Sequence, residues 1–353
     1  MLATTVCYSQ SVLEITFNSL KSGKAILINT NTLDKDTLAF NNGFLAYNGK
    51  LEGPALFSLI ISEYNKNSPI YLILSNEKTQ VEFKSFKKSE ESQNINEVYP
   101  NTPHFLKDPN NNRIFYNFIG SWKKFYNTIQ QLSTDNSEGL LEKRKATYHS
   151  FLNTCDSLIQ ANNNQFVSAV IIDFLLNNGL LQLETIQSFY DYLAPSVKDS
   201  FFGLKIGEYA GKAGRLRPGH SAPDFESVDL DNQKYNLSKL QGKKVLLHFW
   251  SSSCAPCIKV APELTSLAEN NKDNLVTINI SLDTAKDKWV KGINRAGIGR
   301  MRNVCDFTGI QGKVAQDYAI NVVPSYYLID QKAKIIIKGS LNQVSEKIRK
   351  SMP

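Results

Sequence analysis

An apolar run that leads into two cysteines is the feature that most constrains this chain. Residues 243–250 read Lys-Lys-Val-Leu-Leu-His-Phe-Trp, which is typical of a buried strand, and three serines separate this run from Cys254-Ala-Pro-Cys257. A helical pattern follows over residues 254–270. A strand, a short loop and a helix that begins at a cysteine pair predict an α/β domain at this point of the chain.

The position of the cysteine pair suggests its chemistry. Two cysteines three residues apart at the start of a helix can approach within disulfide range. The unpaired N–H groups and the macrodipole at a helix start favour an anion, so the Cys254 thiolate should be stabilised. Pro256 suits the first turn, where its missing N–H costs nothing. Cys254 is therefore a candidate nucleophile, and Cys257 is a candidate resolving thiol.

A metal site or a purely structural role would also account for the pair. A zinc site needs two further ligands, and the chain offers no second cysteine pair and only four histidines, none of them paired. The two cysteines could also be structural residues that are close by coincidence. Redox chemistry is favoured over both, and no metal or cofactor is expected.

Residues 11–90 have the pattern of an all-β domain. Short alternating or apolar runs recur at the spacing of a sandwich or barrel, and Asn41-Asn42-Gly43 predicts a hairpin turn because Asn and Gly tolerate positive φ. No catalytic spacing occurs here. This part is interpreted as a binding, docking or spacing module.

The rest of the chain divides into two patterns. Residues 87–102 are charged and polar and suggest a linker. Apolar residues at steps of three and four predict a helical connector over residues 100–212. Gly and Pro residues between 211 and 218 mark a boundary. Strands then alternate with helices over residues 215–353, as expected for an α/β sheet.

Composition excludes several classes of protein. No apolar run approaches the roughly 18 residues of a membrane span. The net charge is +7; residues 1–214 carry 19 Lys and Arg against 20 Asp and Glu, so residues 215–353 hold the excess. Because these charges are spread singly rather than clustered with aromatic residues, nucleic-acid binding is not expected.

The remaining cysteines and the N-terminus give weaker signals. Five cysteines are an odd number, so a disulfide-stapled scaffold is not expected, and Cys155 and Cys305 are interpreted as small buried hydrophobes. Residues 1–10 resemble the tail of a secretory signal, with cleavage near Ser9, or a plain N-terminal extension. No role is predicted for Cys7.

Several motifs in residues 215–353 occur together in one order. They are the Ala222-Pro223-Asp224-Phe225 entry, the Leu237 to Lys243 turn, Phe249-Trp250 at a strand end, Cys254-Ala-Pro-Cys257, Pro262, Ser281-Leu282-Asp283, and Tyr318 to Pro324. In this order they resemble the TlpA/ResA-like thiol–disulfide oxidoreductases, a branch of the redoxin superfamily. The resemblance covers about two fifths of the chain. More loosely, the upstream part resembles envelope relatives that carry a β-rich domain and a helical connector.

The resemblance implies a thioredoxin fold and assigns roles. Cys254 would attack a partner's disulfide, and Cys257 would release the product. Val323 and Pro324 would form the loop with a cis-proline that holds the partner's backbone against the sulfurs, although a plain strand-entry proline is the alternative. It also implies protein thiol clients, a separate thiol donor that a membrane protein would supply, and a periplasmic or envelope location.

The chain departs from the family pattern at three positions. Ser253 stands where thioredoxins usually have Trp, and Val260 where some relatives have a glutamate. His248 stands six residues before Cys254, where thioredoxins have a buried acid. One hypothesis is that His248 lies near Cys257 and shuttles its proton; a histidine that is merely packed in the core is the alternative.

Two other functions compete with disulfide exchange. A peroxiredoxin-like peroxidase would need Pro and Thr upstream of its cysteine, where this chain has Leu247 and Ser251. A non-catalytic binding protein would act through the N-terminal β domain. The Ala-Pro dipeptide between the cysteines resembles that of reducing thioredoxins, so the reducing direction is expected.

Overall fold

The computed structural model describes residues 9–61, 64–65, 68–89, 100–109, 111–133, 139–181 and 183–351. Residues 1–8, which include Cys7 and most of the predicted signal segment, lie outside the described residues. Contacts group the chain into two compact units. The first holds residues 1–173 with Tyr192–Leu204, and the second holds Phe174–Asp191 with residues 205–353. The domain boundaries drawn from the sequence stay predictions.

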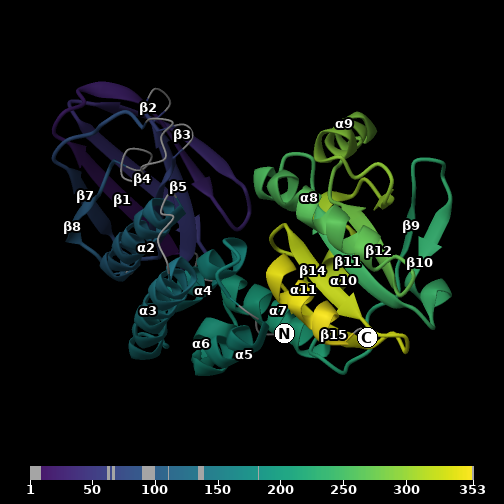
Figure 1. The fold of residues 1–353 in the computed structure, drawn as a ribbon. Coiled ribbons are helices and arrows are strands. Elements are labelled where there is room, and N and C mark those ends of the chain that lie inside the picture. The colour runs from purple at the N-terminus through teal and green to yellow at the C-terminus, as the bar shows by residue number, and fades with distance from the viewer. Residues whose placement is uncertain are drawn as a thin grey trace, which may run out of the picture. The chain divides into compact units, whose positions relative to one another are not determined.

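The N-terminal part is an eight-stranded, mostly antiparallel sheet (Figure 1). Its strands are β1 (Ser9–Phe17), β2 (Ser22–Asn29), β3 (Lys35–Asn41), β4 (Phe44–Leu51), β5 (Ala55–Ile61), β6 (Ile70–Leu74), β7 (Thr79–Phe83) and β8 (His104–Lys107). They are ordered β6-β5-β2-β3-β4-β1-β7-β8, and β1 and β7 run parallel. The predicted turn joins β3 and β4, with φ at 52° for Asn42 and 71° for Gly43. Inward-facing residues of successive strands form one apolar core.

A helical segment follows the sheet. It comprises α2 (Asn112–Ser133), α3 (Leu140–Ala161), α4 (Phe166–Asn177), α5 (Leu183–Tyr192), α6 (Pro195–Lys198) and α7 (Phe201–Arg215). Helices α6 and α7 are separate because Ser200 starts a new helix: its hydroxyl accepts the N–H of Gly203 at 3.2 Å. Within the described residues, no helix is long and apolar enough to cross a bilayer.

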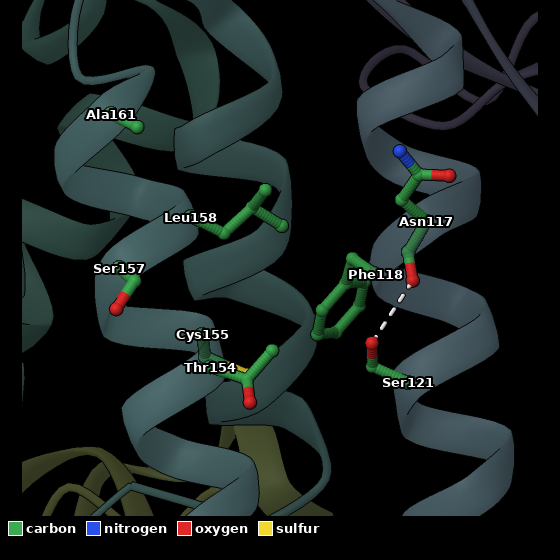
Figure 2. Close-up of a pocket in the computed structure, with 8 residues that line it drawn as sticks. All are labelled: Asn117, Phe118, Ser121, Thr154, Cys155, Ser157, Leu158 and Ala161. Atoms are coloured by element: carbon green, nitrogen blue, oxygen red, sulfur yellow. Dashed lines mark hydrogen bonds between the residues drawn. The ribbon is translucent and has the colours of Figure 1, made fainter.

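A hollow of about 330 Å³ lies between α2 and α3 (Figure 2). Phe118, Cys155 and Leu158 supply apolar lining. The hydroxyls on its rim already bond within their own helices; Ser121 Oγ, for example, donates to the carbonyl of Asn117 at 3.2 Å. Burial raises the pKa of the Cys155 thiol to about 12, so it stays protonated at neutral pH. The hollow therefore presents no reactive group.

The C-terminal sheet has seven strands in the order β10-β9-β13-β12-β11-β14-β15. Along the chain, these strands and the helices between them are β9 (Glu226–Val228), β10 (Lys234–Asn236), β11 (Lys244–Trp250), α8 (Ala255–Asn270), β12 (Leu275–Ser281), α9 (Lys286–Ala296), β13 (Arg302–Cys305), α10 (Lys313–Asp317), β14 (Ser325–Ile329), β15 (Ile335–Gly339) and, at the end, α11 (Leu341–Ser351). Strands β11 and β12 are parallel, and β11 and β14 are antiparallel.

Alternation along β11 separates the two faces of this sheet. Leu246 packs in one cluster with residues of α8 and α11, so these two helices cover the same face. Phe249 points to the other face, where its ring lies 5.4 Å from that of Tyr318. By the same alternation, His248 and Trp250 lie on the face that α8 covers. The chain thus has the predicted layout: an N-terminal sheet domain, a helical middle and a thioredoxin-like C-terminal domain.

Candidate active site

The cysteine pair lies at the start of α8. Cys254 is the N-cap residue, and its Sγ lies 3.1 Å from the backbone nitrogen of Cys257, which donates to it. Pro256 occupies the first turn, as expected. The two sulfurs form a disulfide of 2.04 Å. A backbone N–H that points at Cys254 Sγ from a helix start stabilises negative charge on that sulfur after reduction.

The two sulfurs differ in access and share apolar surroundings. Cys254 is 9% exposed and Cys257 only 1%, so Cys254 is the more accessible of the two. Both belong to one apolar cluster with Trp250 at the end of β11 and with Trp289 and Ile293 of α9. Apolar neighbours of this kind keep water away from the inner sulfur, that of Cys257.

The loop before β14 lies beside the outer cysteine. The Val323–Pro324 peptide bond is cis, and the carbonyl oxygen of Val323 lies 3.6 Å from Cys254 Sγ. In the part of the chain that the structure describes, the N–H of Val323 has no hydrogen-bond partner. A free backbone N–H next to the reactive sulfur can pair with an extended polypeptide.

His248 lies in the core beneath α8. Its Nδ1 is 2.9 Å from Asn279 Oδ1, and its ring stacks on that of Tyr326 at 4.8 Å between centroids. Because the amide oxygen accepts, Nδ1 carries the proton and Nε2 is left as a bare acceptor, for which no partner occurs among the described residues. Burial lowers the pKa of His248 to about 4, so the ring is neutral at pH 7.

The serine loop is held by a carboxylate that no sequence pattern links to it. Asp283, which is buried, accepts the backbone N–H of Ser252 at 3.0 Å and its hydroxyl at 2.6 Å. The Ser281 hydroxyl donates to the same carboxylate at 2.7 Å, and the Arg295 guanidinium donates to the carbonyl of Ser252. Along the sequence, Ser281-Leu282-Asp283 is only one motif of the family resemblance. Its contact with a loop 31 residues away has no local signal.

The remaining predicted positions contribute no reactive group, although Cys305 packs in the same apolar cluster as the cysteine pair and its thiol donates to the carbonyl of Asp283 at 3.3 Å. Leu247 faces away from α8, and the Ser251 hydroxyl lies 3.2 Å from that of Ser253. Cys305 is buried on β13, and burial is the main cause that raises its pKa to about 11. No group of three or more metal-ligating side chains occurs among the described residues.

Comparison with known proteins identifies relatives of the C-terminal part. Residues 218–338 match the AhpC/TSA family. The chain is 31% identical over 150 residues to the thiol-disulfide oxidoreductase ResA of Bacillus cereus, which covers 41% of this chain and 84% of that protein. It is 30% identical over 129 residues to the thioredoxin-like protein YneN of Bacillus subtilis, covering 36% of this chain and 74% of that protein. A solved thiol-disulfide oxidoreductase from Bacteroides fragilis is 28% identical, with 37% of this chain and 99% of that chain aligned and a TM-score of 0.36.

Proposed function

Because this chain belongs to the ResA-like thiol–disulfide oxidoreductases, we propose that it reduces disulfides of envelope proteins through Cys254 and Cys257. The observation that carries the assignment of roles is the asymmetry of the pair. Cys254 is the more exposed and receives a backbone N–H at 3.1 Å, whereas Cys257 is closed off.

In the reduced enzyme the Cys254 thiolate attacks one sulfur of a client disulfide. The client's other sulfur leaves as a thiolate, and a mixed disulfide joins Cys254 to the client. Cys257 then loses its proton and attacks Cys254 Sγ, which frees the second client thiol. Two electrons have passed to the client, and the enzyme is left with the Cys254–Cys257 disulfide. A separate thiol donor, supplied by a membrane protein, reduces it again.

His248 is the proposed acceptor of the Cys257 proton. A neutral ring with a bare Nε2 on the α8 side of β11 can accept a proton, and its pKa of about 4 makes it a weak base in this step. The hydrogen bond from Nδ1 to Asn279 orients the ring. This bond is also what a purely structural histidine would make, so a kinetic measurement must separate the two roles.

Val323 is the proposed docking point for the client. Its free N–H and its carbonyl beside Cys254 Sγ would pair with an extended client segment and bring a client sulfur to the attacking one. Trp250 and Pro256 support the site, the first as packing under the sulfurs and the second in the first turn of α8.

Equilibration of the pair against a series of glutathione or dithiothreitol ratios, followed by thiol alkylation, tests the proposal. We expect one two-electron transition at roughly −270 to −200 mV, the range of reducing members. A midpoint at about −120 mV would make the protein an oxidant. If no intramolecular disulfide formed at any ratio, the exchange mechanism would be wrong and the N-terminal domain would become the place to seek function.

A further inference from the structure

Helices that precede the family match contact the loop that leads to Val323. Leu176 lies near the end of α4, Gly179 follows it, and Tyr209 lies on α7; all three precede residue 218, where the family match begins. They belong to the same compact unit as the loop. A thioredoxin-like domain defined by the family match alone therefore lacks part of what surrounds its docking loop.

Tyr209 fixes an unusual backbone position in this loop. Ala319 has φ at 45°, in the left-handed region that residues other than glycine rarely adopt. The Tyr209 hydroxyl donates to the carbonyl of Ala319 at 2.7 Å. The N–H of the next residue, Ile320, donates to the carbonyl of Ala315 at 2.8 Å. These bonds hold the chain in a conformation that Ala319 would not choose by itself.

Asn321 continues the connection toward the docking point. Its side-chain N–H donates to the carbonyl of Leu176, and its Oδ1 lies 3.1 Å from the Tyr209 hydroxyl. One asparagine is thus held by both upstream helices. It lies two residues before Val323.

Val322 packs directly on the turn after α4. A Cβ built on Gly179 would lie 2.8 Å from Cγ1 of Val322, and Gly179 has φ at 65°. Only glycine permits both this backbone conformation and this close approach. The upstream turn therefore forms a wall against the residue next to Val323.

We propose that Tyr209 and Asn321 are positioning residues that set the backbone of residues 322–324 for polypeptide clients. The proposal rests on the function assigned above. A small disulfide reagent needs only Cys254 Sγ, whereas a polypeptide also pairs with the backbone of Val323. Loss of the upstream contacts should therefore weaken reduction of a polypeptide much more than reduction of a small disulfide.

The test compares two substrates in the full-length chain. Tyr209→Phe removes the hydroxyl and keeps the ring. The substrates are a peptide closed by one disulfide and 5,5′-dithiobis(2-nitrobenzoate). We expect the ratio of kcat/KM for the peptide to kcat/KM for the small reagent to fall about fivefold, the loss of one hydrogen bond, chiefly through a higher KM for the peptide. Tyr235→Phe, which removes a hydroxyl on β10, is the matched control and should leave the ratio unchanged.

The positioning role of Tyr209 and Asn321 can be overturned in two ways. An unchanged ratio in Tyr209→Phe, or an equal loss with both substrates, would overturn the positioning role. Should Tyr209→Phe fold poorly, Gly179→Ala, which pushes on Val322, must lower the same ratio; an unchanged ratio there overturns the proposal too. The redox potential of the pair should not move in either variant. If the unaltered protein reduced neither substrate, the proposed function itself would be wrong, and this inference would fall with it.

Discussion

In the N-terminal sheet domain, buried asparagine side chains use both the amide oxygen and the amide N–H in hydrogen bonds. Asn112 accepts the N–H of Ile73 at 2.7 Å and donates to its carbonyl at 2.9 Å, and Asn65 bonds Ile61 and Leu59 in the same manner. In the C-terminal sheet domain, by contrast, buried polar atoms of aromatic side chains have no partner among the described residues: His248 Nε2, Trp250 Nε1, Trp289 Nε1 and Tyr326 Oη.

The bonded amides of the first domain serve stability, whereas the unbonded His248 Nε2 of the second is available for chemistry. A buried polar group without a partner is costly, so one that lies beside a reactive pair calls for an explanation in the chemistry of the site or in contact with water. The satisfied amides of the first sheet tie loops and helices to strands. In the C-terminal sheet, His248 Nε2 is a free acceptor beneath α8, the helix that holds the cysteines. Substitutions in each domain test this contrast.

The largest expected effect is at the outer cysteine. Cys254→Ser should lower disulfide reduction by roughly a thousandfold or more, because no nucleophile remains to start the exchange. Cys257→Ser should instead accumulate a mixed disulfide with the peptide, visible as a mass adduct. Cys155→Ala is the control and should reduce the peptide normally. An adduct that formed on Cys257 in Cys254→Ser would reverse the assigned roles.

The second effect is a loss of folding stability at acidic pH. The pKa of folded His248 is about 4, below its usual value near 6.5, so the unfolded chain binds more protons in between. This contribution to stability is present above pH 6.5 and is lost as pH falls toward 4, by about 3 kcal/mol in the free energy of unfolding. Urea unfolding of the oxidised protein across this range measures it. His248→Asn should flatten that dependence and the exposed His149→Asn should not; equal curves for both would contradict the buried neutral ring.

The third effect belongs to the first sheet. Asn112→Ala leaves the N–H and carbonyl of Ile73 without their partner and should lower the free energy of unfolding by about 2 kcal/mol. The midpoint potential of the cysteine pair should stay the same. Asn153→Ala, at an exposed position of α3, is the control and should change little. A shifted potential in Asn112→Ala would mean that the two sheets are not separate in function.

The smallest effect is kinetic. His248→Ala should slow resolution of the mixed disulfide about tenfold at pH 7, less than the roughly hundredfold or more of a base whose pKa lies near neutrality, because the pKa of His248 is about 4. The attack of Cys254 on the same peptide should change less than twofold. Rapid mixing with acid quench separates the two steps. An unchanged resolution rate would leave His248 as a packed core residue.

Local chemistry explains which elements could be predicted from sequence. The turn at Asn42-Gly43 and the start of α8 were predictable because single residues carry the signal: a tolerance of positive φ, or a missing N–H at Pro256. Strands β8, β9, β10 and β13 were not predicted. Each has only three or four residues, too few for alternation to stand out.

The same limit applies to the site. Cys254 and Cys257 were recognisable from their spacing, and His248 from the family resemblance, in which its position six residues before the first cysteine holds a buried acid. Asp283 and Tyr209 were not, because Asp283 acts across 31 residues and Tyr209 across 110. Hydrogen bonds between such distant positions depend on the whole sheet being assembled, and no pattern along the chain records them.

The division of the chain into two units has a consequence for how its gene can evolve. The chain passes between the two units three times, after residues 173, 191 and 204. A domain attached by a single linker can be gained, lost or exchanged through one recombination event in the gene. Here a single crossover between residues 174 and 204 would part segments that belong to the same compact unit, so the two units are expected to be inherited as a pair.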